Sequence, residues 1–180
     1  MTTVKPIPPR LPLVEAPKDP LAREQFDELA AGRGILNLHR MMAYAPALMK
    51  ASGDMAMAFR SEAILARALA EIVVLRTAQV ADCDYEWERH VPLARAAGVS
   101  EQQIADVGRW KQSAAFNLKE KAVLKYAETL AGGTPLEDQI FAELQRYLTP
   151  REIVALTMLV GFYVSTAIFI KAMAVPDDNG

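Results

Sequence analysis

Four polar residues near the middle of the chain have the types and spacing of a small catalytic site. They are Glu71, Cys83, Glu86 and His90, and Cys83 is the one cysteine among the 180 residues. At about 100° per residue, a helix through residues 83–90 places Cys83, Glu86 and His90 on one face within an arc of about 60°. A thiol, a carboxyl group and an imidazole together can transfer protons or attack an electrophile near neutral pH. This face is therefore the candidate site.

The helix that carries this face is predicted to start at Asp82 as its N-cap, with Cys83 in its first turn. Backbone N–H groups at a helix start favour the thiolate, which makes Cys83 a candidate reactive thiol. Glu71 lies twelve residues before Cys83, about 18 Å along a continuous helix, which is too far for contact. The chain must therefore turn between about Val80 and Asp82, so that Glu71 folds back toward the same face.

Glu71 interrupts an apolar stretch, since residues 72–75 are Ile-Val-Val-Leu. A buried carboxylate needs a partner or a raised pKa, and Arg76 and His90 are the candidate partners. A buried, perturbed carboxyl group also marks functional sites.

The neighbouring residues receive separate interpretations. Trp87 flanks the face, and Tyr85 and Trp87 are candidates to line a pocket, although such aromatic residues more commonly make core or subunit contacts. Glu88 points away from the face and is predicted to be solvated. The second histidine, His39, is interpreted as structural.

Each candidate also has a purely structural interpretation. A lone cysteine is commonly an inert buried side chain, and Glu86 with His90 is a common helix pair at i and i+4. Glu71 could equally form a surface ion pair with Arg76. The coincidence of three groups on one helical face favours the functional interpretation.

The same spacing resembles a known family motif. Glu71, eleven residues, Cys83, two residues, position 86, three residues and His90, followed by VPLARAAGVSEQQI, resembles the carboxymuconolactone decarboxylase and alkyl hydroperoxidase D superfamily. The resemblance is densest over residues 64–107 and continues more loosely from about residue 36 to the apolar last helix. It implies an alkyl hydroperoxidase D-like helical fold and a homo-oligomer, either a trimer or a hexamer.

The hydroperoxidase branch of that superfamily has the motif Glu, Cys-x-x-Cys, His, in which the thiols form a redox pair and the glutamate and histidine relay protons. The resemblance implies these roles for Glu71, Cys83 and His90. The second cysteine is replaced by Glu86. One thiol cannot form an intramolecular disulfide, so the dithiol cycle is excluded.

The decarboxylase branch resembles a cofactor-free acid–base lyase acting on a small lactone carboxylate, although its typical members lack the cysteine. We therefore expect a cofactor-independent acid–base enzyme, lyase or decarboxylase-like, acting on a small organic acid, lactone or carbonyl compound. His90 and Glu86 would transfer protons, Glu71 would complete the relay, and Cys83 would donate a weak hydrogen bond or act as a second acid.

Two alternatives stay open. In a one-cysteine peroxidase, the Cys83 thiolate attacks a hydroperoxide, becomes a sulfenic acid and is reduced by an external thiol. A charged Glu86 opposes this thiolate unless a protonated His90 offsets it. In the second alternative the protein is a non-catalytic oligomeric helical module, whose polar cluster satisfies itself at a subunit interface.

Composition excludes several other classes of protein. Lys and Arg number 20 against 22 Asp and Glu, and the net charge of −2 gives no basic surface for nucleic acid or an anionic membrane. One cysteine excludes a disulfide framework and a Cys-based zinc cage, and no metal or cofactor is expected. The start MTTVKPIPPRLPLVEAPKDP lacks a signal-peptide pattern, so we expect a cytoplasmic protein.

The pattern of apolar residues, caps and breakers predicts an all-α fold of about eight helices without a sheet. We expect three regions along the chain. Residues 1–18 form a proline-rich extended arm, either mobile or laid over a neighbouring subunit. Residues 19–175 form one helical domain, and residues 176–180 form a tail. Asp19-Pro20 opens the first helix, which ends near Gly32, and further helices cover 36–44, 46–59 and 64–80. Capping boxes start helices at Ser100, Asn117 and Thr149, Thr134-Pro135 opens another, and Gly98 and Gly132-Gly133 end helices.

Residues 153–170 form an uncharged run of 18 residues, which is long enough to suggest a membrane span. The run contains Thr157, Gly161, Ser165 and Thr166, and the sequence has no companion span. We therefore predict a core helix that also packs on another subunit.

Overall fold

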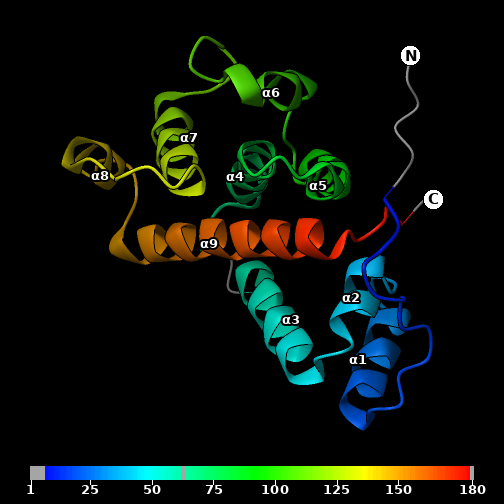
Figure 1. Cartoon of the computed structure of the whole chain (residues 1–180). Helices are drawn as coiled ribbons and strands as arrows, with labels where there is room; N and C mark the ends of the chain where they lie inside the picture. Colours follow the sequence, from blue (N-terminus) through cyan, green and yellow to red (C-terminus); the bar gives the residue numbers. More distant parts are fainter. Residues whose placement is uncertain (1–6, 62–63, 179–180) are drawn as a thin grey trace, which may run out of the picture. The chain divides into compact units, whose positions relative to one another are not determined.

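The computed structural model describes residues 7–61 and 64–178, which form nine α-helices, one short 3₁₀ helix and no strand (Figure 1). The helices are α1 (Pro20–Ala31), α2 (Asn37–Met42), α3 (Pro46–Ser61), α4 (Arg67–Val80), α5 (Asp84–Ala96), α6 (Glu101–Asp106), η1 (Val107–Arg109), α7 (Leu118–Ala131), α8 (Asp138–Gln145) and α9 (Pro150–Met173). The all-α prediction is confirmed for this part of the chain.

The chain divides into two compact units. One comprises the residues up to Ala58 together with those from Phe169 onward, and the other is Phe59–Ile168. The second unit contains all four candidate site residues. The predicted domain limits at 18 and 175 stay predictions, and residues 1–6 of the arm lie outside the described residues.

In the first unit, α1 begins as its sequence predicts. The Asp19 side chain accepts hydrogen bonds from the backbone N–H groups of Leu21 and Ala22, at 2.9 and 3.2 Å. Pro20 occupies the first helical position, where its missing N–H costs nothing. Phe26 of α1 packs in a small core with Ala22, Ala43 and Met49.

The described part of the arm, residues 7–18, is not helical and is bonded to its own unit. The Arg10 N–H donates to the Met173 carbonyl, and the Tyr44 hydroxyl donates to the Pro12 carbonyl. These bonds connect the described part of the arm to its own chain, and the expected mobility or contact with a neighbouring subunit stays a prediction.

The second unit is built around α4, which is buried on nearly every side. Leu69, Val73 and Val74 belong to a core cluster that includes Leu144 and Leu156. Ile72 and Leu75, on the other side of α4, belong to a second cluster with Val107, Trp110 and Leu124. Figure 1 shows α4 between α5 and α7. A helix apolar all round is stable in water only when covered in this way.

The capping boxes at Ser100, Asn117 and Thr149 form as predicted. Gly98 and Gly133 take positive φ values of 89° and 64° after α5 and α7, a conformation in which glycine carries no steric cost. These stops are also confirmed.

Two predicted helix starts are wrong. Cys83, rather than Asp82, is the N-cap of α5, because Asp82 takes a left-handed conformation (φ 51°) in the turn. The helix expected to open at Thr134-Pro135 starts only at Asp138, with Glu137 as N-cap. The Thr134 N–H and hydroxyl instead both donate to the Thr129 carbonyl, which closes the end of α7.

The uncharged run forms most of α9, and only one of its faces is core. Leu156 and Val160 are fully buried, whereas Val154 is 64% and Ile168 64% exposed. Among the described residues, α9 is the one helix long and apolar enough to cross a membrane, and 44% of its apolar window is buried. A single helix of this kind is weak evidence for a span, because the core helices of soluble proteins pass the same test.

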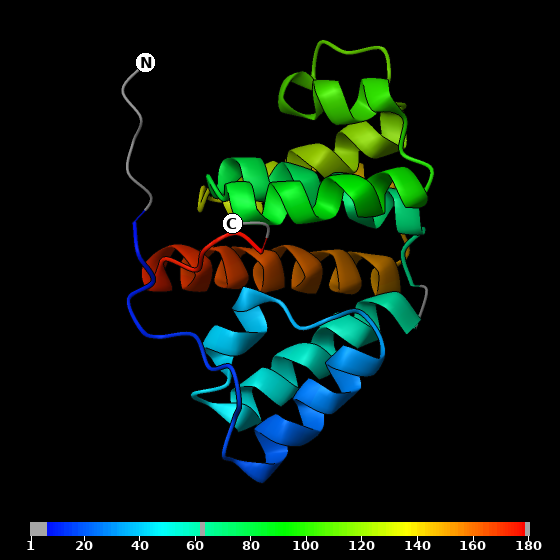
Figure 2. The ribbon, with the colours of Figure 1, turned by 90° about the vertical axis from the view of Figure 1, so that its right-hand side faces the viewer.

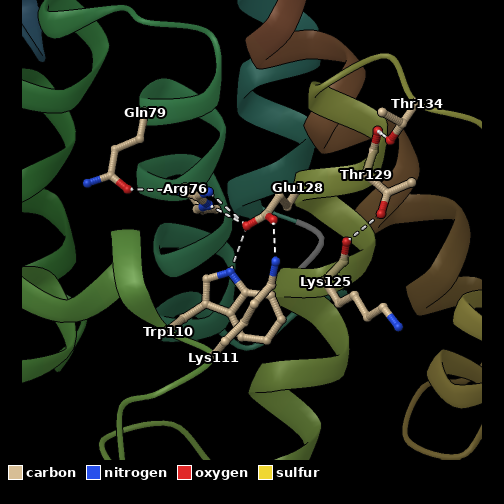
Figure 3. A network of polar contacts seen from close by, with 8 residues as sticks. All are labelled: Arg76, Gln79, Trp110, Lys111, Lys125, Glu128, Thr129 and Thr134. Atoms are coloured by element: carbon tan, nitrogen blue, oxygen red, sulfur yellow. Dashed lines mark hydrogen bonds and ion pairs between the residues drawn. The ribbon is translucent and has the colours of Figure 1, made fainter.

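A polar network ties three elements of this unit together (Figure 3). Glu128 of α7 accepts hydrogen bonds from Arg76 of α4 (2.7 and 3.0 Å), from the Trp110 indole (2.8 Å) and from Lys111 (2.8 Å). Burial raises the pKa of Glu128, but these donors and the Arg76 charge outweigh it and lower the pKa to about 2. Arg76 also donates to Gln79 of α4, at 3.0 Å.

We predict that Glu128→Ala lowers the free energy of unfolding by about 1–3 kcal/mol at pH 7, because the buried Trp110 N–H and Arg76 lose their acceptor. Urea unfolding measures this change. The matched control is Glu101→Ala, which removes an exposed pair with Arg95 and should cost at most about 1 kcal/mol. The ionised Glu128 stabilises the fold above its ordinary pKa of 4.5, and this contribution disappears as the pH falls to about 2. The difference between variant and wild type should shrink over that interval, and equal costs for the two variants at pH 7 would contradict the assignment.

Candidate active site

The turn between α4 and α5 brings Glu71 back to the face of α5. Helix α4 ends at Val80 and α5 begins at Asp84, so the break predicted between about Val80 and Asp82 is present. The Cys83 N–H donates to the Ala78 carbonyl at 3.0 Å, which fixes the first residue of the new helix to the end of the old one. The two helices pack side by side (Figure 2).

Glu71 and His90 are joined by a buried hydrogen bond. Glu71 is 2% and His90 8% exposed, and the Glu71 Oε2 to His90 Nδ1 distance is 2.9 Å. The other oxygen, Oε1, forms an ion pair with Arg67, one turn earlier on α4. Of the two predicted partners of Glu71, His90 is therefore found and Arg76 is not, because Arg76 pairs with Glu128.

This arrangement sets the tautomer of His90. A carboxylate paired with an arginine only accepts hydrogen bonds, so Nδ1 must carry the hydrogen that lies between His90 and Glu71. The lone pair of neutral His90 is then on Nε2, the ring nitrogen turned away from Glu71. His90 is thereby prepared to accept a proton at Nε2, and Glu71 stabilises the charged imidazolium that forms.

Glu86 lies on the same face of α5 and has no hydrogen-bond partner among the described residues. It is 3% exposed, and both of its carboxyl oxygens are fully buried. Burial raises the pKa of Glu86 to about 8. Glu86 therefore carries a proton near neutral pH and is a neutral acid.

The position of Glu86 in α5 explains why its side chain makes no capping hydrogen bond. It is the third residue after the N-cap Cys83, where a glutamate commonly reaches back to the N-cap N–H. Here that N–H is already bonded to Ala78, so the capping box cannot form. The Glu86 carboxyl group therefore makes no hydrogen bond that stabilises the start of the helix.

Two residues of this region were missed by the sequence analysis. Tyr163 of α9 sets its ring edge-on to the imidazole of His90, with ring centroids 4.9 Å apart and an interplanar angle of 90°. Burial raises the pKa of Tyr163 above its ordinary value, so the phenol stays neutral. Tyr163 was missed because no sequence signal distinguishes one tyrosine within a long apolar run. Arg67, by contrast, is four residues before Glu71, a spacing that could have indicated the pair.

The remaining predicted residues take different places. Cys83 is 4% exposed, and Glu86 and His90 of α5 are buried as well. Because Cys83 is the N-cap and not a helical residue, its place on one face with them stays a prediction. Tyr85 is buried, and Trp87 packs against the core cluster of Ile72 and Leu75, which agrees with its alternative as a core contact. Their pocket-lining role stays a prediction.

Glu88 is exposed, as predicted. His39 lies in the first unit, where its Nδ1 accepts the Leu36 N–H at 3.1 Å, a structural contact at the start of α2. No group of three or more metal-ligating side chains occurs within residues 7–61 and 64–178.

The three central groups form a complementary acid–base set. Glu71 is an ionised carboxylate held by Arg67, His90 is a base with its lone pair on Nε2, and Glu86 is a neutral acid one turn away on α5. Two carboxyl groups held in opposite protonation states are typical of sites that move protons at neutral pH.

Comparisons with known proteins show which family and which solved structures this chain resembles. Residues 46–129 match the carboxymuconolactone decarboxylase family. No curated protein sequence matches the chain. A peroxidase-related protein from Silicibacter sp. has a similar structure, with a TM-score of 0.80 and 18% identity over 97% of this chain and 94% of that one. So does an alkylhydroperoxidase AhpD core, a peroxidase-related protein from Ralstonia eutropha, with a TM-score of 0.73 and 15% identity over 94% of each chain.

A third similar structure is the debrominase Bmp8, with a TM-score of 0.78 and 16% identity over 92% of this chain and 90% of that one. A Cys-to-Ala variant of the debrominase has been solved in complex with 2,3,4-tribromopyrrole. At these identities the likenesses show the fold alone.

We predict that Glu86→Gln changes how stability depends on pH. The folded chain holds the Glu86 proton up to about pH 8, whereas an unfolded glutamate releases it near 4.5, so wild-type stability should fall as the pH rises between these values. The variant does not titrate, so its stability should exceed that of wild type by an amount that grows to about 2–5 kcal/mol by pH 8. Urea unfolding at pH 5, 6.5 and 8 measures the difference. Glu88→Gln, at an exposed position, should track wild type, and parallel curves for Glu86→Gln and wild type would show that Glu86 is not held neutral.

Proposed function

We propose that the protein is a member of the carboxymuconolactone decarboxylase and AhpD-like superfamily and a cofactor-independent acid–base enzyme of the lyase or decarboxylase type, because residues 46–129 match the family and the fold resembles that of an AhpD core. Its substrate would be a small organic acid, lactone or carbonyl compound. The superfamily supports a peroxidase-related or decarboxylase-like role in general, and the residues of this chain favour the acid–base chemistry.

The observation that carries the proposal is the different bonding of the two buried carboxyl groups. Glu71 has both oxygens engaged, one by Arg67 and one by His90, so its task is to orient and stabilise the imidazole. Glu86 has neither oxygen engaged and holds a proton. His90 Nε2 would take a proton from the substrate, and Glu86 would donate one to the oxygen on which negative charge develops.

Cys83 has a minor role in this proposal, as a weak hydrogen-bond donor or a second acid. It is buried at the N-cap of α5, before the two proton-transfer groups. The acid–base cycle requires no change in its oxidation state.

We also propose a second candidate, a one-cysteine peroxidase, because the first-turn backbone N–H groups of α5 follow Cys83 directly and favour its thiolate. A negative charge on Glu86 would oppose this thiolate, but Glu86 is neutral below about pH 8. The Cys83 thiolate would displace an alcohol from a hydroperoxide and become a sulfenic acid, which an external thiol would reduce with release of water. The peroxidase-related names of two similar structures agree with this chemistry.

The remaining expectations on the protein's setting stay proposals. A homo-oligomer, trimer or hexamer, would cover the exposed apolar side chains of α9, namely Val154, Met158 and Ile168. A small-molecule substrate and a cytoplasmic location complete the proposal.

We predict that His90→Gln lowers proton transfer by about 10²-fold or more, because Nε2 supplies the base. Cys83→Ser should keep most of the activity. The measurement is exchange of carbon-bound hydrogen in D₂O, followed by ¹H NMR, for a panel of small lactone carboxylates and carbonyl acids. His39→Gln, in the first unit, is the matched control and should be unchanged. Near-complete loss in Cys83→Ser would refute the acid–base proposal in favour of a cysteine-dependent reaction.

Treatment of the native protein with one equivalent of tert-butyl hydroperoxide separates the two candidates. The acid–base enzyme should show an unmodified intact mass after trapping with dimedone. The peroxidase should show a single dimedone adduct on Cys83, which is absent in Cys83→Ser. An unmodified Cys83, together with no proton exchange on any member of the panel, would favour the non-catalytic helical module.

A further inference from the structure

The Glu86 carboxyl group has no hydrogen-bond partner among the described residues. Both of its oxygens are buried and unbonded, although buried polar groups are bonded in the great majority of cases. A buried carboxyl group without partners lowers the stability of a fold, so its presence needs another explanation.

The groups that would usually bond the Glu86 carboxyl group are bonded to other residues. The N-cap N–H of Cys83, its usual partner at this helix position, donates to Ala78. The two partners that a carboxyl group would otherwise recruit, Arg67 and the Nδ1 of His90, are both held by Glu71. Glu86 is therefore the carboxyl group of the site that is left to meet a ligand.

We propose that Glu86 binds an uncharged substrate group in which a carbonyl oxygen lies beside an N–H or an enolic O–H. This inference rests on the proposed function and adds the chemical class of the group that Glu86 recognises. The ligand carbonyl accepts the Glu86 O–H, and the ligand N–H or O–H donates to the other Glu86 oxygen. Both oxygens of Glu86 are then satisfied by a pair of parallel hydrogen bonds.

The number of donors and acceptors selects this class over an anion. A neutral carboxyl group offers one donor and one acceptor side by side. A ligand carboxylate would use the donor alone and would set its negative charge against the second Glu86 oxygen. Such an anion would therefore leave one oxygen unsatisfied and repelled.

The surrounding groups fit an uncharged ligand placed next to the base. Glu86 and His90 are four residues apart on one helical face, about one turn, so a carbonyl group at Glu86 places its neighbouring carbon toward His90. The charge of Glu71 is already paired with Arg67. The ionisable groups around Glu86 and the neighbouring ring of Tyr163 are Cys83 and His90 of α5, Arg67 and Glu71 of α4, Arg60 of α3 and Tyr163 itself.

The test uses δ-valerolactam, a neutral molecule with a carbonyl group beside an N–H, as the probe. Its binding to the full chain is measured by ligand-detected NMR titration at pH 6, where Glu86 is protonated. The N-methyl lactam lacks the donor and should bind at least about tenfold more weakly, and valerate, the matched anion, should bind no better than the N-methyl lactam. Binding of the lactam should fall about tenfold per pH unit above pH 8, as Glu86 ionises.

Two substitutions at Glu86 separate this inference from the proposed function. Glu86→Gln keeps one donor and one acceptor, so it should bind the lactam within about threefold of wild type and lose the pH dependence, while losing proton transfer. Glu86→Leu has neither group and should lose lactam binding. Removing an unbonded buried carboxyl group should not impair folding, which far-UV circular dichroism and thermal melting check. Glu88→Gln should bind as wild type does.

The outcomes are distinct. Equal binding of the lactam and its N-methyl form, preference for valerate, or wild-type binding by Glu86→Leu would each overturn the inference, whatever the activity. Lactam binding that follows the expected pattern in a protein whose His90→Gln variant transfers protons as wild type does would leave the inference standing and overturn the proposed function.

Discussion

The site depends on one carboxylate that the fold carries into its interior. Helix α4 is apolar on nearly all sides and is covered by two core clusters, and Glu71 lies in the middle of it. An ionised group in that position is tolerated only when it is paired, and Arg67 and His90 provide the pairing. The orientation of the imidazole, the turn after Val80 and the packing of α5 on α4 are all consistent with this requirement.

Because Glu71 binds Arg67 and the imidazole N–H of His90, neither of these groups is left for the second carboxyl group. This competition accounts for the different states of Glu71 and Glu86, although both are glutamates and both are buried in the same unit. It also gives the replacement at the second position of the Cys-x-x-Cys pattern a physical meaning. A carboxyl group whose pKa is raised to about 8 has a proton affinity close to that of a thiol, but it cannot form a disulfide.

Much of this could be predicted from the sequence. The periodicity and caps indicated the helices, and the candidate residues Cys83, Glu86 and His90 are all buried. The start of α5 was predicted one residue early, because the left-handed turn at Asp82 depends on how two helices meet. The sequence also left the partner of Glu71 open between Arg76 and His90, since that choice is made by Glu128, 52 residues after Arg76. Tyr163 was unpredictable because its role comes from the packing of α9 against α5.

The place of Tyr163 along the chain has a consequence for biosynthesis. The glutamate, thiol and imidazole all lie between residues 71 and 90, but the ring that packs against His90 belongs to α9, at position 163. On the ribosome, the environment of His90 therefore stays incomplete until α9 has emerged. A nascent chain that ends before α9 therefore lacks the ring that packs against His90.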